Sequence, residues 1–137
     1  EFTDPGASVA FLADALTRLA REEPLASVAV LTPSPAASEL YAAGLVQSGV
    51  VRVHRVKDQQ FRFSPGIEVT EVQQVKGLEF DYVILVEVGD SHYGTDDASR
   101  RLLHVGATRA VHQLWLASTG PASKVVREAA ERAGRRA

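Results

Sequence analysis

The sequence predicts an α/β protein whose mainly parallel sheet is covered by helices on both faces. Short apolar runs typical of buried strands alternate along the chain with stretches of helical periodicity. The most apolar run, residues 82–88, is the candidate for the central strand. The chain has 137 residues, of which 45% are hydrophobic, and this is enough for one core. We therefore expect a single domain over residues 1–137.

The first part of the chain predicts a helix, a strand and a second helix. Residues 28–31 form a short apolar run typical of a strand buried in a parallel sheet. The two prolines of residues 32–35 end this run and begin a helix over residues 36–47. Before Pro24, four apolar side chains recur at helical spacing and predict the first helix: Val9, Leu12, Leu16 and Leu19.

The middle of the chain predicts two further strands. Residues 50–56 and 67–72 alternate between apolar and polar side chains, which indicates strands that each have one face in solvent. We expect residues 57–66 between them to form a loop or a hairpin.

The last part of the chain predicts a helix, a strand and a final helix. Asp96 or Asp97 is suited to cap a helix over residues 98–110. Residues 113–117 then predict the last strand, and a turn leads into the final helix near the carboxyl terminus.

Composition limits the classes of function that fit the chain. The formal net charge of −2 gives no sign of a basic surface for independent DNA binding, so we expect other domains to supply most of the contacts to nucleic acid. The absence of cysteine excludes disulfides and thiolate metal sites, and it is compatible with the cytoplasmic location that we expect. No run of about 18 apolar residues could span a membrane, and residues 1–4 lack the basic start of a secretory signal.

Two motifs carry the chemistry, and they lie about one strand and one loop apart. The first, residues 75–81, contains a Gly-Leu-Glu turn, and the second, residues 102–110, places Arg109 late in the predicted helix. Together they could present a cation and a carboxylate on the same rim of the sheet, where open α/β folds bind ligands. A nucleotide suits this pair, with arginine for a phosphate and Glu79 for the ribose.

These two motifs resemble the fifth and sixth motifs of the UvrD/Rep-type superfamily one helicases, and residues 100–114 are most similar to the HelD and helicase IV branch. The resemblance implies the second, C-terminal motor domain of such a protein, with the RecA-like fold of P-loop NTPases. It also implies half of a split ATP site.

The resemblance assigns a role to each matching residue. Arg109 corresponds to the arginine finger that reaches the γ-phosphate, although an arginine at a helix end can also simply stabilise the helix terminus. Glu79 corresponds to the carboxylate that binds the sugar, with a solvated loop residue as the alternative. Lys76 either contacts phosphate or pairs with a neighbouring carboxylate. The residues implied at the nucleotide are therefore Arg109 as the catalytic residue and Gly77, Glu79, Lys76 and Thr108 as binding residues.

Contacts to nucleic acid are less clearly marked. The family's fifth motif commonly begins Thr-x-His, whereas here Glu71 and Gln73 occupy those places and Thr70 lies one position early. Residues 52–63 form a short basic stretch with two phenylalanines, which either stack on bases or belong to a solvated hairpin with an aromatic ring in the core. The candidate contacts are Thr70, Gln73, Arg52 and Arg55. Asp90 and Tyr93 follow the most apolar strand and are expected on the ligand rim.

The chain lacks a Gly-x-x-x-x-Gly-Lys-Ser/Thr phosphate loop, so we expect the isolated domain to be inactive. ATP with Mg²⁺ would be held mainly by the first motor domain, located upstream in a larger protein of which this chain is a fragment. The expected partners are that N-terminal RecA-like domain and single-stranded DNA, and the expected activity is that of an ATP-dependent DNA helicase. Two alternatives remain open: a HelD-like ATPase that remodels RNA polymerase without unwinding DNA, and a non-catalytic interaction module with a decayed nucleotide site.

Overall fold

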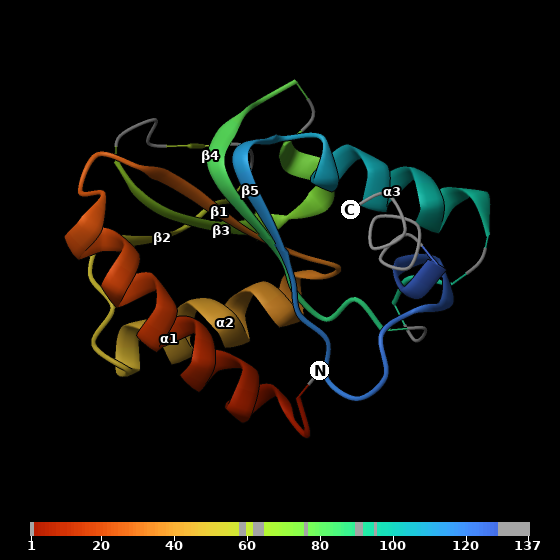
Figure 1. Ribbon diagram of the computed structural model, residues 1–137, viewed down its shortest axis with the longest axis horizontal. Helices are drawn as coiled ribbons and strands as arrows, with labels where there is room; N and C mark the ends of the chain where they lie inside the picture. The colour runs from red at the N-terminus through yellow and green to blue at the C-terminus, as the bar shows by residue number, and fades with distance from the viewer. Residues whose placement is uncertain are drawn as a thin grey trace.

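One five-stranded sheet organises the computed structural model, which describes residues 2–57, 60–61, 65–75, 77–89, 92–94 and 96–128 (Figure 1). In chain order the elements are α1 (Pro5–Glu22), β1 (Ser27–Thr32), α2 (Pro35–Gln47), β2 (Val53–Arg55), β3 (Gly66–Glu71), the 3-10 helix η1 (Val72–Val75), β4 (Phe80–Leu85), α3 (Asp97–Ala107) and β5 (Ala110–Leu116). Residues 124–128 are also helical.

The sheet is parallel in all four of its strand pairings, in the order β2-β3-β1-β4-β5. The predicted parallel α/β fold is confirmed. β1, however, lies in the middle of the sheet, so the expectation that the most apolar run would be central is wrong. Strand order depends on how the crossover connections are arranged, and β4 is as apolar as β1 because both are interior strands.

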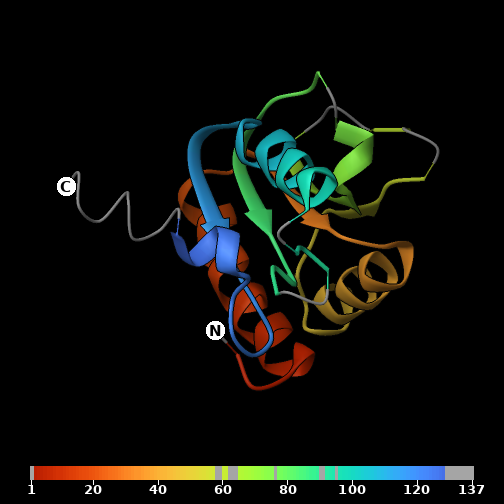
Figure 2. The same cartoon turned by 90° about the vertical axis from the view of Figure 1, so that its right-hand side faces the viewer.

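Helices cover both faces of the sheet (Figures 1 and 2). α1 and α2 lie on one face, where alternate strand residues such as Val30 and Ile84 join one apolar cluster. α3 and residues 122–126 lie on the other face, against Leu31 and Leu85. Because β3 is an interior strand, residues 67–70 are all buried, and the prediction that one face of this strand meets solvent is wrong.

The predicted starts of α2 and α3 are confirmed by their caps, whereas α1 starts at Pro5, earlier than the expected start after Ser8, and is capped by Asp4. The Asp96 carboxylate accepts a hydrogen bond from the Ser99 backbone N–H at 3.0 Å, and Ser34 accepts one from Ala37 at 3.2 Å. α3 ends at Ala107, three residues earlier than predicted, so Arg109 lies in the turn between α3 and β5.

β2 is shorter than predicted, since Arg52 has a positive φ of 58° and the strand begins only at Val53. β2 and β3 pair in parallel, which excludes a hairpin between them. No helix in the described part of the chain is long and apolar enough to cross a membrane.

Candidate nucleotide-binding edge

Two turns that lead into neighbouring strands meet at the amino-terminal edge of the sheet. Residues 77–79 precede β4, and Thr108 and Arg109 precede β5. The Phe80 backbone N–H donates to the Arg109 carbonyl at 2.8 Å, which holds the two turns together. The prediction that Glu79 and Arg109 share one rim is therefore confirmed. The expectation that this rim is the ligand edge of open α/β folds is wrong, because that edge lies at the carboxyl ends of the strands.

Arg109 is half-buried, and part of its side chain is held by α3. Its Nε donates to the Val105 carbonyl at 3.2 Å, and its backbone N–H donates to the Gly106 carbonyl at 3.2 Å. These contacts satisfy carbonyls that the end of the helix leaves unpaired. Within the described residues, the two terminal nitrogens have no hydrogen-bond or ion-pair partner. The outer part of the guanidinium is thus available to an anion.

Thr108 and Gly77 shape the two turns. Thr108 caps α3, and its hydroxyl lies within hydrogen-bonding distance of the His104 and Val105 carbonyls, at 2.9 and 3.1 Å. Gly77 has a positive φ of 84°, and a Cβ built there would meet no atom within 4 Å. Glycine is therefore required by the backbone conformation, and the space beside it is open. Lys76 lies outside the described residues.

Glu79 is exposed and lines a depression of about 250 Å³ at this edge. The depression carries three carboxylates, those of Glu68, Glu79 and Asp81, beside the apolar side chains of Leu25, Phe61 and Phe80. Carboxylates accept hydrogen bonds and repel phosphate, so this surface is suited to hydroxyl or amine groups of a ligand.

Asp81 has a structural role that the motif alone did not predict. Its carboxylate accepts a hydrogen bond from the Ser27 backbone N–H at 2.9 Å, and its own N–H donates to the Ser27 hydroxyl at 3.0 Å. The pair fixes β1 to β4 directly beside Glu79. The position of Asp81 at the start of a strand was the only signal for this role in the sequence.

The predicted nucleic-acid contacts do not form one surface. Arg52 lies at the amino-terminal edge, where its Nη1 donates to the Pro24 carbonyl at 3.3 Å. Thr70 is fully buried in β3, and within the described residues its hydroxyl has no hydrogen-bond partner. Gln73 is exposed on η1, near the carboxyl end of β3. Arg55, at the end of β2, is the one of the four that shares an open depression with Gln73.

This carboxyl-edge depression, of about 700 Å³, has balanced charges. Arg55 forms ion pairs with Glu71 at 3.0 Å and with Glu39 at 3.2 Å, and Lys57 lies 3.6 Å from Glu39. The complete lining is Pro35, Glu39, Arg55, Lys57, Glu71, Gln73 and Gln74. Two carboxylates thus neutralise the two cations that could bind a phosphate.

The remaining candidates divide between the core and undescribed positions. Phe61 is half-buried and packs against the core, with its ring centroid 6.1 Å from that of Phe80, and it also lines the depression beside Glu79. Tyr93 is fully buried; burial raises its pKa, and within the described residues its hydroxyl has no partner. Arg62, Phe63 and Asp90 lie outside the described residues. The described part of the chain contains no cluster of three His, Asp or Glu side chains that could hold a metal ion.

Comparison with known proteins identifies the segment that contains both turns. Residues 66–117 match the family model of the UvrD-like helicase C-terminal domain. This UvrD-like segment includes Gly77, Glu79 and Arg109, and it excludes Arg52 and Arg55. Comparison with curated proteins gives no match.

Solved helicase structures share the fold. The C-terminal domain of a possible DNA helicase from Lactobacillus plantarum WCFS1 is similar with a TM-score of 0.78 and 28% identity, over 91% of this chain and 74% of that one. The UvsW helicase from bacteriophage T4 is similar with a TM-score of 0.55 and 12% identity, over 86% of this chain and 45% of that one. The Pyrococcus furiosus Hef helicase domain is similar with a TM-score of 0.54 and 13% identity, over 93% of this chain and 27% of that one. The chain therefore has the α/β fold of helicase C-terminal RecA-like domains.

Proposed function

We propose that this chain is the C-terminal motor domain of an ATP-dependent DNA helicase or translocase, and that it completes an ATP site held mainly by the first motor domain of the same protein. The UvrD-like segment and the helicase-type fold support this assignment. The observation that carries it is the outer part of the Arg109 guanidinium, which has no partner among the described residues and lies at the edge of the sheet where Glu79 also lies.

Arg109 acts on the phosphate end of the nucleotide. A planar, permanently charged fork suits the charge that spreads over the phosphoryl oxygens as they are transferred. The bond from Nε to Val105 fixes the base of the fork, so its orientation costs less conformational entropy on binding. Arginines in this role raise the rate by about 10³ to 10⁵ where they have been measured.

Glu79 acts on the sugar end. The three carboxylates of its depression disfavour phosphate, and Glu79 is the one whose place in the motif resembles the helicase sugar contact. ATP with Mg²⁺ supplies the phosphoryl group that is transferred. The first motor domain would hold most of the nucleotide and its Mg²⁺. Opening and closing of the cleft between the two domains would couple hydrolysis to movement along single-stranded DNA.

The test is the ATPase rate of the full-length protein, with and without single-stranded DNA. We expect Arg109→Ala and Arg109→Lys to lower a DNA-stimulated rate by about 10³ while nucleotide still binds. Arg21→Ala is the control, because Arg21 is an arginine near the end of a different helix, in the last turn of α1. Full activity in both Arg109 variants would refute the proposal.

A second candidate, the HelD-like ATPase that remodels RNA polymerase, is favoured by the charge balance around Arg55. The ion pairs to Glu39 and Glu71 leave the carboxyl-edge depression without a net positive charge for DNA phosphates. An ATPase rate that depends on Arg109 but is indifferent to DNA would support this candidate over the helicase.

A further inference from the structure

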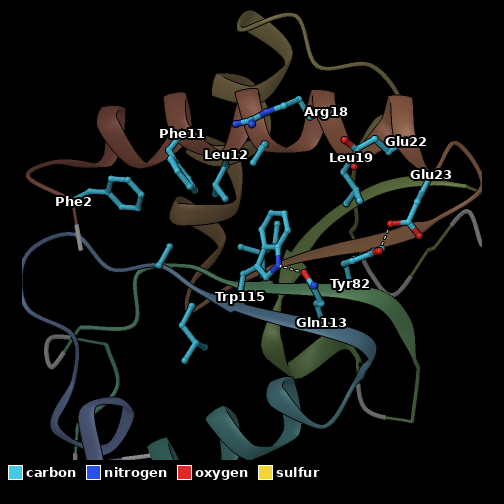
Figure 3. A pocket seen from close by; sticks show the side chains of 14 residues that line it. Phe2, Phe11, Leu12, Arg18, Leu19, Glu22, Glu23, Tyr82, Gln113 and Trp115 are labelled. Carbon is cyan, nitrogen blue, oxygen red and sulfur yellow. Dashed lines mark hydrogen bonds between the residues drawn. The ribbon is translucent and has the colours of Figure 1, made fainter. Parts of the chain in front are cut away.

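Two depressions of similar volume differ in their chemistry. The groove between α1 and β5, of about 670 Å³, is lined mostly by apolar and aromatic side chains such as Phe11, Tyr82 and Trp115 (Figure 3). The carboxyl-edge depression, of about 700 Å³, is lined mainly by charged and amide side chains. It also lies at the edge where open parallel sheets bind their ligands. Of the two, the carboxyl-edge depression is therefore the one suited to a polar ligand.

Three donors converge on the carboxylate of Glu71, the last residue of β3. Its Oε2 accepts a hydrogen bond from the Ser38 hydroxyl at 2.7 Å and lies 3.0 Å from Nη1 of Arg55. Its Oε1 accepts a hydrogen bond from the Gln74 side-chain amide at 3.3 Å. Only 13% of the Glu71 side chain is exposed. A hydroxyl from α2, a guanidinium from β2 and an amide from η1 thus surround one anionic group.

The same kinds of donor bind backbone phosphates. Arginine, serine and glutamine side chains all contact phosphate oxygens in protein–DNA complexes. A carboxylate and a phosphodiester are both anions whose oxygens accept charge-assisted hydrogen bonds. The donors around Glu71 are therefore suited to a phosphate as well as to a carboxylate. The alternative is a purely structural link, in which Glu71 only ties α2 and β2 to the end of β3.

The inner end of this network needs an acceptor at all times. Ser38 and Thr32 are fully buried, and their hydroxyl oxygens lie 2.6 Å apart, within hydrogen-bonding distance. A buried hydroxyl that loses its acceptor destabilises the protein. Departure of Glu71 is therefore favourable only when another acceptor replaces it. A phosphate oxygen supplies that acceptor and also restores the negative charge beside Arg55.

We propose that Glu71 is an internal competitor for a backbone phosphate of single-stranded DNA: it occupies a subsite formed by Ser38, Arg55 and Gln74, and binding of the strand displaces it. This inference rests on the proposed function, in which single-stranded DNA is a partner. Glu39 has a different effect. It pairs with Arg55 at 3.2 Å and its side chain is 58% exposed, whereas the buried Ser38 hydroxyl donates to Glu71. Glu39 thus alters the charge of the depression without filling the subsite.

The test is the affinity of the full-length protein for a labelled single-stranded oligodeoxynucleotide, measured by fluorescence anisotropy at low salt without ATP. We expect Glu71→Gln to bind about threefold to tenfold more tightly than the wild type, because the competing charge is gone. Glu39→Gln is the matched control, since it changes the net charge equally, and its gain should be smaller.

Ser38→Ala separates the subsite from a general effect of charge. In the wild type it should change the affinity by less than about twofold, because the hydroxyl is lost to Glu71 and to the phosphate alike. In the Glu71→Gln background it should remove most of the gain, because there the hydroxyl serves the phosphate. In the Glu39→Gln background it should have little effect.

Two further arms keep the test decisive. An oligonucleotide with uncharged methylphosphonate linkages should show no gain with Glu71→Gln, since the subsite takes a charged phosphate. Glu71→Asp keeps the charge but withdraws it from Ser38 by one methylene group. It should gain about twofold or more, and it serves as the second variant if Glu71→Gln does not fold.

Three results would overturn the proposal. In the first, neither Glu71→Gln nor Glu71→Asp gains affinity, as a purely structural link predicts. In the second, Glu39→Gln gains as much as Glu71→Gln. In the third, the gain persists with Ser38→Ala or on the uncharged oligonucleotide. These measurements involve neither ATP nor Arg109, so an ATPase that depends on Arg109 would leave the proposed function standing when this inference fails.

Discussion

Two arginines at opposite edges of the same sheet differ in what their side chains can still bind. At the amino-terminal edge, the terminal nitrogens of Arg109 have no partner among the described residues. At the carboxyl-terminal edge, Arg55 is paired with both Glu39 and Glu71. A free fork can bind a phosphate at once, whereas a paired one must first lose its carboxylate partners. Both edges carry an arginine, but only at the candidate nucleotide edge is the guanidinium available to bind a phosphate.

The largest expected difference is between alanine variants of these two arginines in the full-length protein. Arg109→Ala should lower the ATPase rate by about 10³, because the transferring phosphoryl group loses its cation. Arg55→Ala should change the rate at saturating DNA by no more than about fivefold, because Arg55 lies at the opposite edge of the sheet from the proposed ATP site and its side chain is already paired with Glu39 and Glu71. Steady-state ATP hydrolysis checks both. Equal losses in the two variants would show that the edges are not functionally distinct.

A smaller effect is expected from Glu79→Gln, which keeps the size of the side chain and removes its charge. Loss of a hydrogen bond between a charged group and the sugar should raise the KM for ATP by about tenfold and leave kcat nearly unchanged. Initial rates over a range of ATP concentrations measure this split. Asp14→Asn, on the exposed face of α1, is the control. A lower kcat with an unchanged KM would contradict a role in sugar binding.

Glu71→Gln tests the charge balance at the carboxyl edge. The substitution removes one of the two partners of Arg55, and we expect the affinity of the full-length protein for single-stranded DNA to rise by about threefold to tenfold at low salt. Fluorescence anisotropy with a labelled oligonucleotide measures it. Glu39→Gln, which removes the more exposed partner, should have the smaller effect. No change in either variant would exclude this depression from DNA binding.

The smallest effect is expected from alanine substitutions at two glycines, which distinguish backbone strain from contact with the nucleotide. Gly77 and Gly49 both have positive φ, at 84° and 88°, and a Cβ at either would meet no atom within 4 Å. Alanine at either position should therefore lower the free energy of unfolding by about 1 to 2 kcal/mol, measured by urea denaturation. Only Gly77→Ala should also raise the KM for ATP. A raised KM in both variants would indicate general destabilisation.

Local patterns were sufficient to predict most of the fold. Helical periodicity located α1 and α2, and the apolar runs located β1 and β4, because each of these signals lies within one short segment. The order of the strands and the burial of Glu68 and Thr70 within β3 depend on contacts between distant segments, and no local pattern contains them.

The site shows a similar limit. The motifs brought Glu79 and Arg109 to one edge, but the edge was misassigned, although the sequence held the necessary signal: both turns precede their strands, and a turn before a parallel strand lies at its amino end. The pairing of Arg55 with Glu39 and Glu71 joins three separate elements, so it could not be predicted from spacing. Lys76 and Asp90 stay predictions, because the structure does not describe them.

The most direct test of the central claim is the affinity of the full-length protein for ADP with tetrafluoroaluminate, which mimics the phosphoryl group in transfer, compared with its affinity for ADP alone. If Arg109 acts on that group, the wild type binds the mimic far more tightly than ADP, and Arg109→Lys loses about 10² or more of this preference while its affinity for ADP is preserved. An Arg109→Lys variant that keeps the full preference would contradict the account.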